Sequence, residues 1–258
     1  MRDLVRVLAV LIVVLAVGAP AAADTLYGVV FENTGSVTER LETIGPVTGA
    51  LTPVGGGIAS CCLVPSGVST LDPVTDRFYF IGSYQIDPGG TSRIFTLALG
   101  TGAVLGDPVL PAANNYNFIE VDRTTGTLYG VVFDTGASTE RLVTIDPTTA
   151  AVTTVGASIA GCCLVPSGTS ALDPGAGVFY FFGAYQADPP GTSRIFTLAL
   201  ATGAVVSDPI LAAGNNENFL EVNPATGTLY AVVFETATTT ERLVTIAPAT
   251  GVLTPGSA

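Results

Sequence analysis

The sequence predicts an all-β fold assembled from repeated four-stranded antiparallel sheets. One observation behind this prediction is a long repeat, because the run TLYGVVF at Thr25 returns at Thr127 and, with one change, at Thr228. Another is composition, since Gly, Thr, Val and Pro are abundant and no long helix-period pattern follows the N-terminal segment. A repeat at fixed spacing indicates units that bury their apolar faces against one another.

The N-terminal segment, residues 1–23, is typical of a secretory signal peptide. Arg2 and Arg6 flank the start of an apolar run over residues 7–19, and a small-residue cleavage site ends at Ala23. The run is shorter than the roughly 20 residues that a membrane-spanning helix needs. We therefore expect a secreted or periplasmic protein with no membrane span in its mature form, residues 24–258. A retained single-pass anchor is the alternative.

The mature chain is strongly acidic. The full sequence has 9 basic and 21 acidic residues, and removal of Arg2, Arg6 and Asp3 leaves seven and 20, a net charge near −13. It contains no lysine and no histidine. Nucleic acid is thereby excluded as a partner, because binding it depends on clustered Lys and Arg. Cations or cationic surfaces suit this charge, although acidity that only keeps an exported protein soluble is the alternative interpretation.

Each copy of the long repeat contains two related halves, which each predict a four-stranded meander. One half spans residues 118–156 and the other residues 169–211, and each consists of four short apolar runs separated by turn residues such as Asp-Pro and Thr-Gly. The central runs are apolar on both alternating faces, as in Leu128 to Phe133. A strand buried on both faces belongs to a sheet packed between two others. Such sheets, repeated at this interval, predict a β-propeller.

The turns divide the mature chain into five blades within a single domain. The predicted blades are about 24–55, 67–110, 117–156, 168–211 and 218–255, and the first lacks a run equivalent to FIEVD. Two blade types alternate along the chain, and Ala258 falls where a third CCLVPSG loop would begin. Five blades are therefore the first prediction, and a six-bladed design lacking one blade is the alternative.

The sequences of the predicted blades resemble those of a known class of repeat protein. The runs FIEVDRTTGTLYGVVF and FLEVNPATGTLYAVVF resemble the generic blades of exported bacterial β-propeller repeat proteins, with NHL-like or lactonase-like blades. The resemblance implies that the FIEVD-like run is the innermost strand of a blade and the AVTTVG-like run the outermost. It covers nearly all of the mature chain and concerns fold rather than activity.

The elaborated loops are predicted to lie on one face of the ring, opposite a face of plain turns. The first candidate site there combines asparagines with glutamates where crossings enter the innermost strands, and such oxygen ligands suit calcium. The alternative is that the asparagines cap turns or satisfy backbone groups. These candidate residues are Asn114, Asn115, Asn117, Glu120, Asn215, Asn216, Asn218 and Glu221.

The second candidate is the adjacent cysteine pair that occurs twice, as Cys61 with Cys62 and as Cys162 with Cys163. An exported protein meets an oxidising compartment, so all four cysteines are expected to be paired. Pairing can be vicinal or can join the two loops, for example Cys61 to Cys162, and the sequence does not decide between them. Structural disulfides are favoured over a redox role or soft-metal binding.

The third candidate is a pair of aromatic loops. Tyrosine with amide and carboxylate groups can grip a sugar or a peptide, whereas the alternative is a long hairpin in which Tyr packs on the blade rim and Arg93 or Arg194 pairs with a local Asp. The loop residues are Tyr84, Gln85, Asp87, Tyr185, Gln186 and Asp188.

Catalysis has little support, because the chain has no histidine for a triad and no metal motif of the usual spacing. We expect an exported non-enzymatic scaffold whose loop-rich face binds a protein, a glycan or a cation. The alternative is a calcium-dependent lactonase-like hydrolase with a metal at the channel mouth. That alternative rests on the resemblance, since exported lactonases of this kind are propellers that use Glu, Asn and Asp around the channel.

Overall fold

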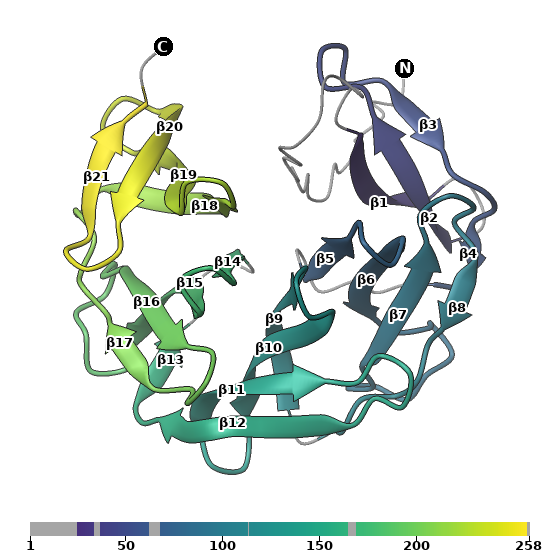
Figure 1. Cartoon of the computed structure of the whole chain (residues 1–258), viewed down its shortest axis with the longest axis horizontal. Helices are drawn as coiled ribbons and strands as arrows, with labels where there is room; N and C mark the ends of the chain where they lie inside the picture. The colour runs from purple at the N-terminus through teal and green to yellow at the C-terminus, as the bar shows by residue number, and fades with distance from the viewer. Residues whose placement is uncertain (1–24, 34–36, 62–67, 113, 165–168, 257–258) are drawn as a thin grey trace.

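The computed structural model describes residues 25–33, 37–61, 68–112, 114–164 and 169–256. Within these residues the chain forms 21 strands and no helix, so none of them forms a helix that could span a membrane. The strands make five antiparallel blades arranged around a common centre (Figure 1). This confirms the prediction of an all-β propeller with five blades. The predicted signal peptide, residues 1–23, lies outside the described residues.

Blades 2 to 5 each contain four strands that follow one another in chain order from the centre to the rim (Figure 1). Their bounds are β5 (Ser69–Asp72), β6 (Arg77–Gly82), β7 (Arg93–Ala98) and β8 (Val104–Gly106) in blade 2; β9 (Asn114–Asp122), β10 (Thr127–Asp134), β11 (Thr139–Ile145) and β12 (Val152–Ile159) in blade 3; β14 (Ser170–Asp173), β15 (Val178–Tyr185), β16 (Arg194–Ala199) and β17 (Val205–Ser207) in blade 4; and β18 (Asn215–Asn223), β19 (Thr228–Glu235), β20 (Thr240–Ala247) and β21 (Val252–Pro255) in blade 5.

Blade 1 differs from the others at the centre of the ring. It consists of β1 (Leu26–Asn33), β2 (Val37–Ile44) and β3 (Leu51–Pro53), with the short β4 (Ile58–Ala59) also paired to β2. Since β1 corresponds in sequence to β10, no described strand takes the innermost place that β9 has in blade 3. The short β13 (Cys162–Leu164) is an addition to blade 4, where it pairs with β15.

The plain face of the ring is built from turns that are closed by their own side chains. In the turn from β9 to β10, the Asp122 carboxylate accepts hydrogen bonds from the Thr124 backbone N–H at 2.8 Å and the Thr125 hydroxyl at 2.8 Å. Gly126 then adopts a positive φ of 74°, which a residue with a Cβ rarely does. These short turns set the register of the strands that carry the candidate site.

Neighbouring blades pack through two alternating kinds of interface. In the first, which we call the aromatic interface, an odd-numbered blade packs on the phenylalanines of the even-numbered blade that follows it. Between blades 3 and 4 it buries Phe118, Val131, Leu142, Phe179, Phe181, Phe196 and Leu198. Apart from that of Phe118, which has no described counterpart in blade 1, equivalent positions meet between blades 1 and 2. Phe181 and Phe196 stack with ring centroids 4.9 Å apart, and Phe118 lies 5.3 Å from Phe181.

The second kind, the aliphatic interface, joins an even-numbered blade to the odd-numbered blade that follows. Between blades 4 and 5 it buries Tyr180, Phe182, Ile195, Leu229, Val233, Val244 and Ile246. Equivalent positions meet between blades 2 and 3. Because side chains alternate along a strand, the two interfaces use opposite faces of a blade. Both faces of blades 2, 3 and 4 are covered in this way.

The ring is open between its first and last blades. Figure 1 shows blade 1 and blade 5 on the two sides of an opening, whereas all other neighbouring blades lie side by side. An even-numbered blade would be next in the alternation after blade 5. The five described blades thus leave the series of interfaces unfinished at that point.

Candidate binding face and channel

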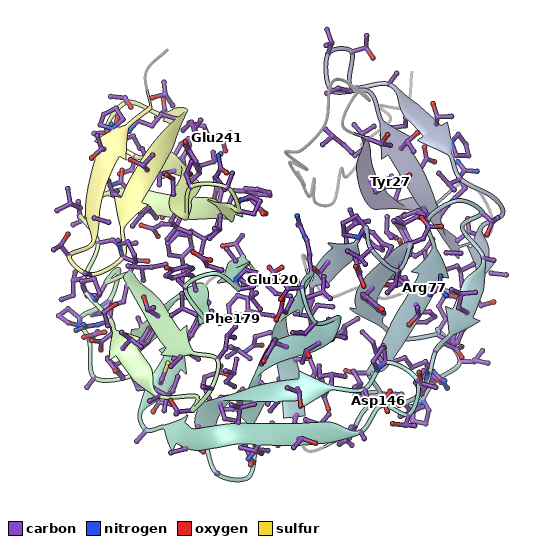
Figure 2. All side chains as sticks on the ribbon, in the orientation of Figure 1. Tyr27, Arg77, Glu120, Asp146, Phe179 and Glu241 are labelled. Atoms are coloured by element: carbon purple, nitrogen blue, oxygen red, sulfur yellow. The ribbon has the colours of Figure 1, made fainter. Side chains whose placement is uncertain are left out.

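The innermost strands bring polar side chains of three blades together at the centre of the ring (Figure 2). Glu120 on β9 accepts hydrogen bonds from the Ser170 hydroxyl of blade 4 at 2.8 Å and from the Thr70 hydroxyl of blade 2 at 3.3 Å. The Thr70 hydroxyl also accepts the backbone N–H of Val121 at 3.3 Å. Thr70 and Ser170 were not among the predicted site residues, because small hydroxyl residues on short strands carry no distinctive sequence signal.

Glu120 and Glu221 are brought close enough to influence each other. Burial, followed by the negative charge of Glu221, raises the pKa of Glu120 to about 8, against the opposing effects of Ser170 and Arg123. Burial raises the pKa of Glu221 to about 7, again opposed by Arg123. A carboxyl group with a pKa near 8 is mostly protonated at neutral pH. The hydrogen bonds that Glu120 accepts from Ser170 and Thr70 join blade 3 to blades 4 and 2.

The predicted asparagines do not converge on this pair. Asn117 donates to Glu140 at 2.7 Å, and Asn218 donates to Glu241 at 3.0 Å, so both amides point to the third strand of their own blade. Asn114 accepts from Arg141 at 3.0 Å.

The remaining asparagines do not join the carboxyl pair either. Asn215 donates to the carbonyl of Ala212 at 3.2 Å, while Asn115 and Asn216 are exposed. In the described part of the chain, no group of three or more Cys, Asp or Glu side chains could hold a metal ion. The sequence-predicted set is therefore divided between the channel and the blade edges.

The partner of Asn117 is a buried glutamate that sequence reasoning missed. Glu140 on β11 is fully buried, and its Oε2 atom has no hydrogen-bond partner among the described residues. Burial raises its pKa to about 7, although the hydrogen bond from Asn117 opposes this shift. Glu39 holds the same position in blade 1, and burial raises its pKa to about 7 as well. The available signal was the repeated TER motif, in which a charged residue recurs inside a strand.

The predicted loop-rich face is held together by contacts between crossings and hairpins. The carbonyl of Ser60, in the crossing that leads to blade 2, accepts a hydrogen bond from the backbone N–H of Gln85 at 2.9 Å. In blade 4, the carbonyl of Gly161 accepts one from the backbone N–H of Gln186 at 2.9 Å. Cys61 forms an isolated β-bridge with Tyr84. The cysteine loops and the aromatic loops therefore lie on the same end of their blades.

Cys61 and Cys162 are fully buried within the aromatic interfaces, and neither is a free thiol in the described structure. Cys62 and the side chain of Cys163 lie outside the described residues. The choice between vicinal and cross-loop connectivity therefore stays a prediction.

The aromatic loops are fixed by an identical clamp in blades 2 and 4. In blade 2, Arg93 donates to both carboxylate oxygens of Asp87 at 2.8 and 2.9 Å and to the carbonyl of Asp107 at 2.9 Å. The Tyr84 hydroxyl donates to Asp107 at 2.7 Å, and the Arg93 guanidinium lies 5.2 Å from the centre of the Tyr84 ring.

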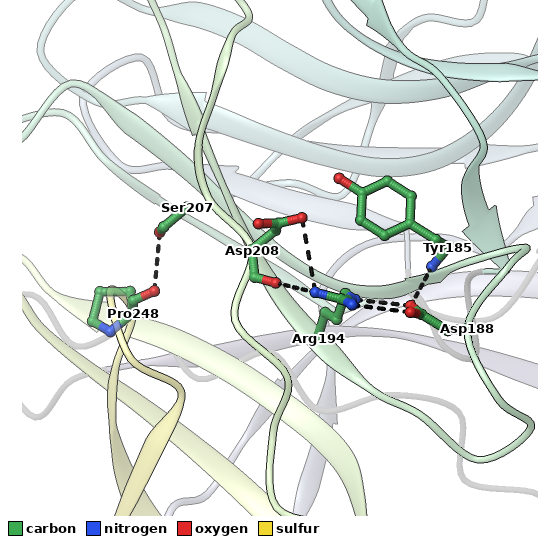
Figure 3. A network of polar contacts seen from close by, with 6 residues as sticks. All are labelled: Tyr185, Asp188, Arg194, Ser207, Asp208 and Pro248. Atoms are coloured by element: carbon green, nitrogen blue, oxygen red, sulfur yellow. Dashed lines mark hydrogen bonds and ion pairs between the residues drawn. The ribbon is translucent and has the colours of Figure 1, made fainter.

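Blade 4 repeats the clamp with Asp188, Arg194 and Asp208, and Figure 3 shows these contacts. Burial and the hydrogen bond to Asp208 raise the pKa of Tyr185 to about 12, so the phenol stays protonated. The hydrogen bonds from Arg194 lower the pKa of Asp188. The tyrosines and aspartates of both loops are thus engaged internally, and Gln85 and Gln186, which lie between them in sequence, are exposed.

Comparisons with known proteins support the fold. The crystal structure of a nidogen/laminin complex is 15% identical, with a TM-score of 0.53, over 90% of this chain and 74% of that one. A cobalt-substituted apocarotenoid oxygenase from Synechocystis is 13% identical, with a TM-score of 0.53, over 89% of this chain and 57% of that one. An exo-β-1,3-galactanase from Phanerochaete chrysosporium with β-1,3-galactotriose is 10% identical, with a TM-score of 0.56, over 97% and 62%.

These similarities concern the fold alone, since the identities are low and the structures include both enzymes and a binding complex. The chain spans little more than half the length of the oxygenase and galactanase structures. No curated protein matches the sequence. Residues 84–257 match a family described as a repeat of unknown function, DUF6923, which is most of the chain. The chain belongs to the DUF6923 repeat family, here folded as a five-bladed β-propeller.

Proposed function

We propose that the protein is an exported, non-enzymatic binding scaffold that works through its loop-rich face. The observation that carries the proposal is the pair of identically clamped hairpins in blades 2 and 4. In each, an arginine bonded to both oxygens of an aspartate holds the base of the loop, while the tip faces solvent. Ile86, beside the clamped Asp87 in blade 2, is 85% exposed. Rigid loops that need no ordering on binding lose little conformational entropy, which favours recognition.

The two hairpins belong to equivalent positions of the repeat, so the face offers two loops with the same clamp, although Ile86 of the first is Ala187 in the second. A partner with two matching epitopes would bind both loops, and the second contact would form at a high effective concentration. The net negative charge of the chain favours a partner that is neutral or cationic rather than a polyanion. A protein or a neutral glycan fits these conditions.

The test is a binding screen with a matched set of variants. The mature chain is applied to arrays of glycans and of peptides, alongside a double variant with Gln85→Ala and Gln186→Ala. We expect binding by the wild type that weakens at least about tenfold in the double variant. The control, Thr124→Ala in a plain-face turn, should bind like the wild type. Calcium-dependent lactone hydrolysis that Glu120→Gln abolishes would contradict a non-enzymatic role.

A further inference from the structure

Blades 3 and 5 carry the same apolar face, but only blade 3 has it covered. The face of blade 3 presents Phe118, Val131 and Leu142 to blade 4 within the aromatic interface. At the equivalent positions, 101 residues later in the printed sequence, blade 5 carries Phe219, Val232 and Leu243. The side chains are identical in type, and their strands pair in the same registers. At these three positions the two faces therefore present the same side chains in the same arrangement.

The side chains on the face of blade 5 are more exposed than their equivalents in blade 3, because blade 5 has no neighbour on that side. Leu142 is 0% exposed, whereas Leu243 is 53% exposed. Phe118 and Val131 are buried, whereas Phe219 and Val232 are only half-buried. Glu140 is buried and its equivalent Glu241 is exposed. An apolar sheet face that stays in contact with water marks an interaction surface or an aggregation hazard.

The cover that this face accepts is shown twice in the same molecule. In blade 4 it consists of four side chains: Phe179, Phe181, Phe196 and Leu198. Blade 2 presents the matching set, Phe78, Phe80, Phe95 and Leu97, to blade 1. In both cases two of the phenylalanines stack, with centroids 4.6 Å apart in blade 2 and 4.9 Å apart in blade 4. The exposed face of blade 5 continues this series of interfaces.

We propose that the face formed by Phe219, Val232 and Leu243 is a docking surface for a four-stranded blade of the even-numbered type, supplied from outside residues 25–256. The occupant presents three phenylalanines and a leucine arranged as in blade 4. A second copy of this chain does not supply such a blade, because its own blades 2 and 4 are already packed between neighbours on both faces.

The polar edge of the docking surface is already arranged for this occupant. Asn218 donates to Glu241 at 3.0 Å, as Asn117 donates to Glu140 at 2.7 Å in the covered interface. The uncovered face therefore has the hydrogen bond that its covered counterpart has, and little rearrangement is needed on docking. A preformed surface of this kind binds with a small ordering cost.

The first test uses the mature chain and, as a probe, a polypeptide that copies blade 4, residues 157–211. Calorimetry and light scattering should report a one-to-one complex. Leu243→Asp should weaken binding at least about tenfold, because it places a charge against the phenylalanines. Leu105→Asp is the matched control, since Leu105 is 50% exposed but lies on the outer strand of blade 2.

If the isolated probe does not fold, a fusion protein tests the same proposal. Residues 157–211 are appended to the mature chain, and its melting temperature is compared with that of the parent chain. The expected result is a rise of several degrees in Tm, lost with Leu243→Asp and kept with Leu105→Asp. No rise, or a rise unaffected by Leu243→Asp, overturns the proposal. A dimer of the parent chain that Leu243→Asp dissociates also overturns it, because a second copy would then occupy the face.

Discussion

Blades 3 and 5 are two copies of one sequence repeat in different surroundings. Both place a phenylalanine, a valine and a leucine on the same face, and both join an asparagine to a glutamate at its edge. Blade 3 is packed between two neighbours, whereas one face of blade 5 borders the opening in the ring (Figure 1). In a repeat protein, stability is a sum of unit terms and nearest-neighbour interface terms. The presence of a neighbouring blade, rather than the type of side chain, therefore decides how much each of these residues contributes to stability.

The largest expected difference is between Leu142→Ala and Leu243→Ala. Leu142 is fully buried, so its truncation leaves a cavity and should lower the free energy of unfolding by about 2–5 kcal/mol. Leu243 is half-exposed, so the same change should cost about 1 kcal/mol or less. Urea unfolding of both variants measures the difference. Equal losses would mean that the face of blade 5 is covered in solution.

A second comparison sets Glu140→Gln against Glu241→Gln as a function of pH. Burial raises the pKa of Glu140 from the usual 4.5 to about 7, so the folded state holds a proton that the unfolded chain releases. Stability should therefore fall as pH rises from about 4.5 to about 7 and stay reduced above pH 7. Glu140→Gln removes this cost, on the order of 3 kcal/mol at pH 8, and changes little at pH 4.

The matched variant Glu241→Gln should change stability far less at either pH, since the side chain of Glu241 is exposed. Thermal unfolding at pH 4 and at pH 8 gives both values for each variant. A wild-type protein that grows more stable between pH 5 and pH 7, with Glu140→Gln losing that gain, would refute the account of the buried carboxyl.

The smallest expected difference concerns the arginine that follows each of these glutamates. Arg141 pairs with Asp134 at 2.8 Å and also donates to Asn114 at 3.0 Å. Arg242 pairs with Glu235 at 2.7 Å, and both of these side chains are more exposed than their counterparts. Exposed ion pairs contribute little and are screened by salt. Arg141→Ala should lower Tm by a few degrees, and Arg242→Ala by less. The reverse order in a calorimetric scan would contradict this ranking.

Much of this architecture could be predicted from the sequence, because turns and apolar runs are local signals. The number of blades and the alternation of blade types followed from these turns and apolar runs. The position of Asn117 did not, because a register shift between Val131 and Val132 makes a β-bulge in β9. The bulge puts Asn117 on the same face as Phe118 and so beside Glu140, which strict alternation would not do. The alternation of blade types did indicate that a further unit would follow blade 5, but local patterns do not show whether the face of that blade is covered.

The buried glutamates show the same limit. From the sequence alone, residues 32–40 are interpreted as a loop, yet Glu39 lies within β2 and is buried. Burial of this kind depends on packing between units that are distant in sequence. The loop clamp was easier to foresee, since the pairing of Arg93 or Arg194 with a local aspartate was one of two interpretations of that sequence. The internal bonds of Tyr84 and Asp87 agree with that interpretation.

The most direct test of the central claim measures access to the two equivalent leucine positions. Leu142→Cys and Leu243→Cys are placed separately in residues 24–258 of the chain, and the rate of alkylation of the new thiol is followed by mass spectrometry under native conditions. We predict that the thiol at position 243 reacts at close to the rate of an unfolded control, while the thiol at position 142 is protected until the protein unfolds. Equal protection at both positions would contradict the account, because the face of blade 5 would then already be covered.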